Sequence, residues 1–385
     1  MIKNVVVKKV LKGSVFRIIT LVNKVVPKDD KRILLYNGNK GVSFNNEEIL
    51  NYLLENNYNS KYKILCAVEG KKYFGKNMPN VQYITQKVAI VEYMRTKHVF
   101  YTAGQLPIKP ATDQIVIHMN HGVTDYKTMG TMTNISNGDE HFFTYMIASA
   151  PIYVPIEAKA YRCSEDDIKV TGEPMADRLL HPRKVYQYDN YKRVLLWAPT
   201  FRQSDYLGYD DSDYDNLIPL FENGKYDELN TKLKDAECLL IVKLHPSQTL
   251  NGWISGYYSN LKIYTHEDFV KDNINIYDLM ASVDCLIGDY SSASLQYLLT
   301  DKPVAFVIPD IEDYKIKRGF VFENPTDYMP GHLIYTQQDF WDFLTELSMG
   351  IDNYSNQRKK IKNIIHQYKD GKSIERILEL GKIEK

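Results

Sequence analysis

The stretch VDCLIGDYSSASLQYLLTDKPVAFVIP (residues 283–309) contains two apolar runs with a segment of helical length between them. VDCLIG (283–288) and PVAFVIP (303–309) have the length of buried strands, and the segment after Ser291 has the length of a short helix. A strand, a helix and a second strand in this order form one unit of a parallel sheet that helices cover. The stretch therefore predicts an α/β fold.

The same alternation of strands and helices occurs in two series along the chain. The first begins with the strand RILLYN (32–37) and the helix NNEEILNYLLENN (45–57), and the second begins with the strand RVLLWAPT (193–200). A chain of 385 residues is too long for one core of ordinary size, so about two domains are expected. We predict two doubly wound, Rossmann-like domains that face each other across a cleft, over residues 27–185 and 186–385. The tail from Thr336 is expected to form two helices within the second domain.

Overall composition excludes several classes of protein. Acidic and basic residues balance at 48 each, so no net charge attracts the chain to nucleic acid. The four cysteines are scattered without CxxC or His/Cys ligand spacing, which argues against a zinc site and against a disulfide framework. A reducing cytoplasm is the expected location.

The first 26 residues depart from this neutrality. Six basic residues and no acidic one occur before Pro27, and apolar residues recur at helical spacing. Lysines interrupt the segment too often for a membrane span, so it predicts a basic amphipathic helix that lies on an anionic membrane surface. A helix docked on the core of the protein, with its lysines in water, is the alternative.

Polar residues follow the predicted strands directly, where open α/β sheets bind their ligands. DYSS (289–292) combines two hydroxyls, Ser291 and Ser292, with the free amide donors of a helix start, which suit phosphate oxygens. A serine that merely caps the helix is the simpler alternative. Cations that could converge on a diphosphate also follow strands: Arg202, Lys243, His245, Lys315, Lys317 and Arg318. DDSDYD (210–215) reads as a solvated acidic turn and not as a metal site.

His121 is a candidate general base. It follows a strand of the first series and precedes Gly122, which allows a tight backbone turn beside a ligand. A histidine with a pKa near neutrality can take a proton from an attacking hydroxyl. A lone histidine at a strand end is more often a satisfied polar residue, so the assignment depends on its neighbours.

Six motifs between about residue 100 and residue 325 resemble those of one family. They are HGVTDYKTMG, GEPMADRLL, WAPTFR, KLHPSQ, IYDLMASVDCLIGDYSSASLQYLLTDKPVAF and DIEDYKIKRGFVFE. Their order and approximate spacing are similar to those of the CDP-glycerol glycerophosphotransferases, which prime and polymerise teichoic acids and related capsule polymers.

The resemblance implies a GT-B fold and a transfer of glycerol phosphate, or a related polyol phosphate, from a CDP-activated donor to a hydroxyl of a lipid-linked saccharide or polymer, with release of CMP. It implies that His121 is the base and that His245 contacts the diphosphate. The implied donor-binding residues are Gly122, Arg202, Lys243, Asp289, Ser291, Ser292, Lys317 and Arg318. Asp125 and Lys127 are expected on the acceptor side. No metal is needed in principle, and the expected location is peripheral, on the inner face of a bacterial cell membrane.

Three departures from the family pattern concern the choice of donor. Gln296 stands where an acidic residue follows DYSS, Met175 and Ala176 replace Arg and Asn, and VTD (123–125) replaces a small polar, proline and leucine sequence. The donor is therefore CDP-glycerol or another CDP-polyol such as CDP-ribitol. A glycosyltransferase with a nucleotide-sugar donor and a non-enzymatic nucleotide-binding relative are the alternatives.

Overall fold

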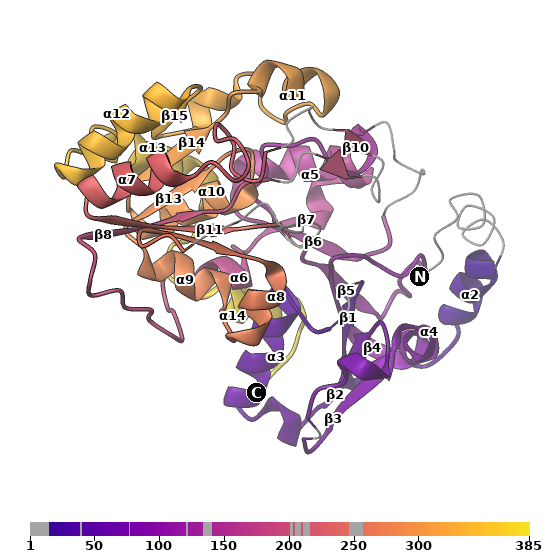
Figure 1. Ribbon diagram of the computed structural model, residues 1–385. Helices are drawn as coiled ribbons and strands as arrows, with labels where there is room; N and C mark the ends of the chain where they lie inside the picture. The colour runs from indigo at the N-terminus through magenta and orange to yellow at the C-terminus, as the bar shows by residue number, and fades with distance from the viewer. Residues whose placement is uncertain are drawn as a thin grey trace. The chain divides into compact units, whose positions relative to one another are not determined.

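The chain divides into two compact units, and each contains one parallel sheet. The computed structural model describes residues 15–38, 41–76, 78–120, 122–133, 141–200, 203–204, 209–210, 216–245 and 257–385. The first unit comprises Met1–Val123, Met129–Asp177 and Asp370–Lys385. The second comprises Thr124–Thr128 and Arg178–Lys369. Figure 1 colours the chain from one end to the other.

The first unit is built on a seven-stranded sheet in the order β3-β2-β1-β4-β5-β6-β7. Its strands are β1 (Asp29–Asn37), β2 (Lys63–Val68), β3 (Val81–Thr85), β4 (Thr96–Thr102), β5 (Ile115–His118), β6 (Tyr145–Ala148) and β7 (Ile168–Val170). All neighbouring pairs are parallel. Consecutive residues of β1, Ile33 to Leu35, are fully buried because helices cover both faces of the sheet. The strand order reverses between β1 and β4.

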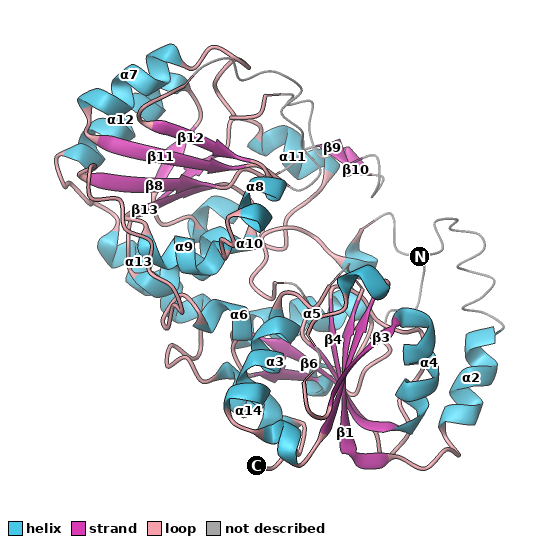
Figure 2. Cartoon of the chain, turned by 60° about the horizontal axis from the view of Figure 1, so that its bottom comes forward, coloured by secondary structure: helices cyan, strands magenta, loops and turns pink. Residues whose placement is uncertain are grey.

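Helices α3 and α4 lie on opposite sides of this sheet (Figure 2). The helices of the first unit are α2 (Val15–Asn23), α3 (Asn45–Glu55), α4 (Gln86–Arg95), α5 (Val154–Tyr161), α6 (Pro174–Asp177) and α14 (Ser373–Leu380). Ile49, Leu50 and Leu53 of α3 recur at helical spacing and are buried in the core beside β1.

The second unit is built on a six-stranded parallel sheet in the order β12-β11-β8-β13-β14-β15. Its strands are β8 (Arg193–Trp197), β11 (Cys238–Lys243), β12 (Leu261–Tyr264), β13 (Cys285–Gly288), β14 (Val304–Val307) and β15 (His332–Ile334). A separate antiparallel pair joins β9 (Gln203–Ser204) to β10 (Tyr209–Asp210). The strand order reverses between β8 and β13, and the prediction of two doubly wound units is confirmed.

Helices also cover both faces of the second sheet. They are α7 (Asp227–Asp235), α8 (His266–Lys271), α9 (Ile276–Ser282), α10 (Ser292–Tyr297), α11 (Ile311–Lys317), α12 (Gln337–Ser348) and α13 (Ser355–Ile365). One core contains Trp197 of β8, Leu233 of α7 and Phe340 of α12, and the rings of Trp197 and Phe340 stack at 5.4 Å. None of the described helices is both long enough and apolar enough to cross a membrane.

The C-terminal tail differs from its prediction. It contains three helices, α12, α13 and α14, and the prediction of two was wrong. Glycines in the left-handed region, Gly350 at φ 75° and Gly371 at φ 68°, lie in the segments that separate them. The last helix returns to the first unit, where the Ser373 amide and hydroxyl donate to the Asp177 carboxylate at 2.7 and 2.9 Å.

Candidate functional site

In the second unit, three neighbouring strands end together, and each is followed by one of the motifs. Trp197 of β8 pairs with Val242 of β11 on one side and with Ile287 of β13 on the other. Their carboxyl ends therefore meet at the point where the strand order reverses, which is the usual ligand-binding edge of such a sheet. WAPT, KLH and DYSS all begin at this edge.

Asp289 ties two of these loops together. Its carboxylate accepts hydrogen bonds from the Thr200 amide at 2.7 Å, the Thr200 hydroxyl at 2.6 Å and the Ser291 amide at 3.1 Å. The residue is 1% exposed. These bonds and the burial of Asp289 favour a structural role, in which the carboxylate holds the two loops together, over the predicted direct contact with a donor. Thr200 was not among the predicted site residues, although its place after a strand was the available signal.

The helix start at DYSS has the local structure that the sequence predicts. Ser291 is the N-cap of α10, and its hydroxyl accepts from the Ala293 amide at 3.4 Å. Ser291 and Ser292 are half-buried. At the strand end, Gly288 leaves room for the Ser294 side chain, because a Cβ there would lie 1.9 Å from the Ser294 hydroxyl and would displace it. Capping by Ser291 is thus shown, and anion binding by the two serines stays a prediction.

Part of the HGVTDYKTMG motif belongs to the second unit, although the sequence placed all of it in the first domain. Thr128 donates to two carbonyls, from its amide to Gly319 at 3.2 Å and from its hydroxyl to Arg318 at 2.6 Å. The amide of Val321 donates to the Tyr126 carbonyl at 2.7 Å. The segment Thr124–Thr128 therefore packs against the KRGF motif, which is predicted to bind the donor.

The predicted acceptor-side pair lies within this segment. Lys127 forms an antiparallel bridge with Phe320, and the Thr124 hydroxyl donates to the Ser292 carbonyl at 3.5 Å. Asp125 lies between them in the chain and also belongs to the second unit. Lys243, Ser291, Ser292 and Arg318, which are predicted to bind the donor, belong to the same unit.

His245 stands in a cationic neighbourhood. Atoms packed round its ring and the nearby charges of Lys243, Lys127 and His266 lower the pKa of His245 to about 4, although the residue as a whole is exposed. Burial also lowers the pKa of Lys243, whose ammonium donates to the Leu244 carbonyl at 3.1 Å. These groups form a site of positive potential beside DYSS and Thr124–Thr128.

Residues 310–320 pack beside DYSS. Lys317 pairs with Asp313 at 3.3 Å, and the Arg318 amide donates to the Tyr314 carbonyl at 2.8 Å. Tyr290 of DYSS is buried, its ring centroid lies 4.3 Å from that of Tyr314, and its hydroxyl donates to Asp310 at 2.9 Å. Tyr290 therefore anchors DYSS to the motif DIEDYKIKRGFVFE, a structural role that was not predicted from the sequence.

In the first unit, Asn45 holds the backbone that precedes Gly122. Its side-chain amide donates to the carbonyls of Met119 at 3.0 Å and Asn120 at 3.2 Å, and its carbonyl accepts from the Met175 amide at 3.0 Å. Asn120 adopts a left-handed φ of 52°, and its carbonyl also accepts from the Thr102 hydroxyl at 2.5 Å. Asn45 was not predicted as a site residue, because a single asparagine after a loop does not indicate a functional position.

Two predicted site residues, His121 and Arg202, lie outside the described residues. Gly122 is described and buried in the first unit. Gln296, one of the departures from the family pattern, is buried in α10 and accepts from the Tyr277 hydroxyl at 2.9 Å. Over the described ranges, no group of three or more histidine, cysteine or carboxylate side chains is arranged to hold a metal ion.

Comparison with solved structures identifies the fold. The wall teichoic acid polymerase TagF superposes with a TM-score of 0.71 at 19% identity, over 98% of this chain and 95% of that one. A putative UDP-N-acetylglucosamine 2-epimerase from Listeria monocytogenes gives a TM-score of 0.54 at 12% identity, over 91% of this chain and 95% of that one. At these identities the likeness is one of fold alone, and it confirms the predicted GT-B class.

Sequence comparison identifies the family. The teichoic acid ribitol-phosphate primase of Bacillus spizizenii is 28% identical over 61% of this chain and 58% of that protein. The teichoic acid glycerol-phosphate primase of Bacillus subtilis is 27% identical over 61% of this chain and 56% of that protein. The match thus spans less than two thirds of either relative. The family model described as CDP-glycerol:poly(glycerophosphate) glycerophosphotransferase matches residues 18–381. The chain belongs to the CDP-glycerol:poly(glycerophosphate) glycerophosphotransferase family.

Proposed function

We propose that this protein transfers a polyol phosphate from a CDP-activated polyol to a hydroxyl of a teichoic acid-type acceptor and releases CMP. The acceptor oxygen forms a bond to the β-phosphorus of the donor while the bond from that phosphorus to the CMP oxygen breaks. The acceptor proton passes to a base. The packing of Thr124–Thr128 against KRGF carries the proposal, since it brings two distant family motifs into one unit beside DYSS.

The donor diphosphate is proposed to bind at the carboxyl edge of the second sheet. His245 and Arg318 supply positive charge or hydrogen-bond donors there, and the start of α10 supplies amides beside Ser291 and Ser292. Lys127, predicted on the acceptor side, is proposed to join them because it pairs with Phe320 of KRGF. Gly122, Arg202, Lys243 and Lys317 complete the proposed set. Positive groups fixed before the reaction stabilise the charge that develops on CMP as it leaves.

His121 is proposed as the general base for the acceptor hydroxyl, as its motif implies. Asn45 and Thr102 support this role indirectly, because both bind the carbonyl of Asn120, the preceding residue. Asp289 is proposed to keep Thr200 and Ser291 in place around the donor, and not to bind it.

Membrane association is proposed for the N-terminal segment. Five apolar residues in and directly after α2 remain exposed: Val15, Ile18, Leu21, Val22 and Val25. Asn23 fixes the end of α2 to the first unit through hydrogen bonds to the Lys109 carbonyl and to Gln114. An exposed apolar helix face beside basic residues favours an anionic lipid surface, where a lipid-linked acceptor would reside.

Vesicle sedimentation tests the membrane proposal. Ile18→Glu with Leu21→Glu should reduce recovery on anionic vesicles several-fold, because two carboxylates enter the apolar face. Val185→Glu, an exposed valine in the second unit, is the matched control and should leave recovery unchanged. Equal recovery of all three proteins would refute the assignment.

Calorimetry tests the donor site. Lys127→Met should weaken CDP-glycerol or CDP-ribitol binding by about tenfold, because a charge-assisted hydrogen bond to phosphate is lost. Lys234→Met removes the same charge from the exposed face of α7 and should not change affinity. Unchanged affinity in Lys127→Met would remove this residue from the donor site.

A further inference from the structure

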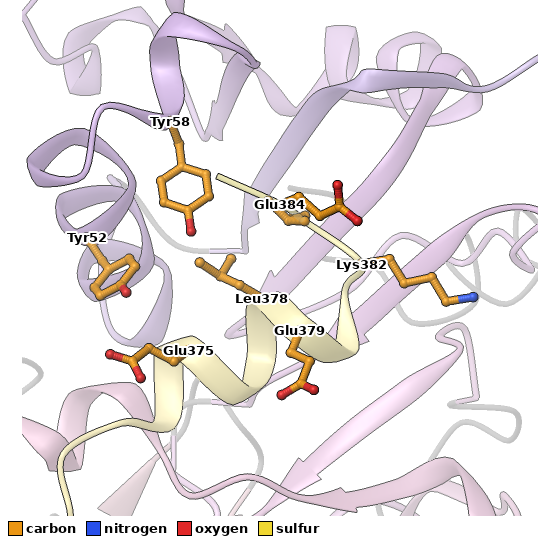
Figure 3. Close-up of a pocket in the computed structure, with 8 residues that line it drawn as sticks. Tyr52, Tyr58, Glu375, Leu378, Glu379, Lys382 and Glu384 are labelled. Atoms are coloured by element: carbon orange, nitrogen blue, oxygen red, sulfur yellow. The ribbon is translucent and has the colours of Figure 1, made fainter.

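The first unit contains a pocket of about 450 Å³ that the proposed reaction does not use (Figure 3). Its volume is within the usual range for sites that bind small molecules. It is lined by residues of α3, of the 3-10 turn Tyr58–Ser60 and of the C-terminal segment: Tyr52, Tyr58, Glu375, Leu378, Glu379, Lys382, Ile383 and Glu384.

This pocket lies at the edge of the first sheet opposite to the ligand-binding edge. Helix α3 begins after the carboxyl end of β1 and runs back, so Tyr52 and Tyr58 lie near the start of β2 at Lys63. The pocket is therefore separate from Asn45 and Asn120, which lie at the carboxyl edge of the same sheet.

Hydrogen bonds hold the walls of the pocket in place. The Tyr62 hydroxyl donates to the Glu384 carbonyl at 3.0 Å and accepts from the Glu384 amide at 3.2 Å. A ring nitrogen of His98 lies 2.8 Å from the Gly381 carbonyl. The segment after α14 is thus fixed to the unit, and a ligand would meet a preformed surface.

Tyr58 offers its hydroxyl to a ligand in the pocket. It is only 8% exposed, it lines the pocket, and its hydroxyl makes no hydrogen bond to any other part of the chain that the structure describes. The hydroxyl is not among the fully buried polar atoms that lack a partner, so it stays open to the pocket and can bind a ligand there. The Tyr52 ring lies 6.4 Å from the Tyr58 ring, and the two rings form an aromatic wall.

The charge of the pocket indicates the class of ligand. Figure 3 shows the Glu375 carboxylate on the side of α14 where Tyr52 lies, whereas the Lys382 ammonium points away from Tyr58 and Leu378. Burial and the negative charge of Glu375 raise the pKa of Tyr52, so its phenol stays neutral. No ion pair to Glu375 occurs among the described residues. Leu378 and Ile383 are buried and supply an apolar floor.

We propose that this pocket binds a primary alkylammonium ion. The ammonium would lie between the Glu375 carboxylate and the Tyr58 hydroxyl, donating to both. Its alkyl chain would cover Leu378 and Ile383, and the tyrosine rings would face the cation. A free amine is the expected occupant.

Titration calorimetry with hexylamine at neutral pH and low salt tests this site, with 1-hexanol as the neutral counterpart. Hexylamine should bind saturably at one site and hexanol at least tenfold more weakly. Glu375→Gln and Tyr58→Phe should each weaken hexylamine binding about tenfold. Glu228→Gln on α7 and Tyr335→Phe, both exposed, are the matched controls and should bind as the unaltered protein does.

The proposal fails if hexylamine does not saturate, if hexanol binds equally well, or if Glu375→Gln and Tyr58→Phe bind like their controls. Nα-acetyl-lysine amide distinguishes the source of the ammonium. Weaker binding than hexylamine supports a free amine as the natural occupant, whereas equal binding supports an ammonium site that also accepts lysine side chains. The donor-site experiments do not depend on either result.

Discussion

The guanidinium of Arg178 forms two hydrogen bonds, each 2.7 Å long, with the two carboxylate oxygens of Asp278. Arg178 comes from the GEPMADRLL motif and Asp278 from IYDLMAS, and their side chains are 9% and 2% exposed. Asp278 also accepts from the Arg183 amide at 3.0 Å. A buried ion pair within the second unit therefore links two motifs that are far apart in sequence.

Asp278→Ala should lower the free energy of unfolding by about 3–5 kcal/mol, because it leaves a buried guanidinium without its partner. Urea denaturation followed by circular dichroism measures the change. Asp272→Ala, at an exposed position just after α8, should stay within about 0.5 kcal/mol. A similar small loss in Asp278→Ala would show that the pair contributes little.

Thr200 and Asp289 should be energetically coupled. A double-mutant cycle with Thr200→Val and Asp289→Asn isolates the interaction between the hydroxyl and the carboxylate, which meet at 2.6 Å. We expect a coupling energy of about 1–3 kcal/mol, since the acceptor is charged and buried. Additive effects of the two substitutions would contradict the tie between the loops.

His245 should remain neutral well below the pH at which histidines usually titrate. Atoms packed round the ring and the nearby positive groups lower its pKa from 6.5 to about 4 in the folded state, although the residue as a whole is exposed. As the pH falls below about 6.5, the unfolded state takes up the proton first, so the folded state loses stability down to about pH 4 and no further. NMR titration of the imidazole measures this pKa directly.

Two variants separate the causes of that shift. Lys127→Met should raise the pKa of His245, whereas the remote Lys234→Met should not. A bound diphosphate should also raise this pKa, because a negative charge favours the imidazolium. A titration midpoint near 6.5 that neither Lys127→Met nor donor changes would contradict the cationic site.

Asn45→Ala should slow turnover by about tenfold or more while donor affinity is kept. The substitution removes the hydrogen bonds to Met119, Asn120 and Met175, and with them the support of the backbone that precedes the proposed base. Asn51→Ala, on the same helix, is the matched control. Equal loss of turnover in both variants, or a parallel loss of donor affinity in Asn45→Ala, would contradict this positioning role.

The first strand of each series was readable from the sequence because its buried run is continuous. RILLYN and RVLLW are parallel strands with helices on both sides, and such strands carry apolar residues at every position. DYSS was also placed correctly at a strand end, because Gly288 and Ser291 mark the turn and the helix cap.

Other features depend on contacts between distant segments, which local patterns do not encode. Thr124–Thr128 follows a strand of the first sheet yet packs against Arg318 and Gly319. The charged sequence of α14 matches any surface helix. Its bonds to Asp177 and the burial of Ile377 and Leu378 in the first core show that it belongs to the first unit. Asp289 was predicted to bind the donor because it follows a strand at the ligand-binding edge. In the structure its carboxylate oxygens accept hydrogen bonds from Thr200 and Ser291.

The most direct test of the proposed activity is acceptor-dependent release of CMP. Purified protein would be mixed with a lipid-linked disaccharide and, in turn, with CDP-glycerol, CDP-ribitol or a UDP-sugar, and CMP would be quantified by chromatography. We predict CMP release with one CDP-polyol, dependence on the acceptor, and a loss of about 100-fold or more in His121→Ala with donor binding retained. Release of UDP from a UDP-sugar, without CMP from either CDP-polyol, would contradict the proposed reaction.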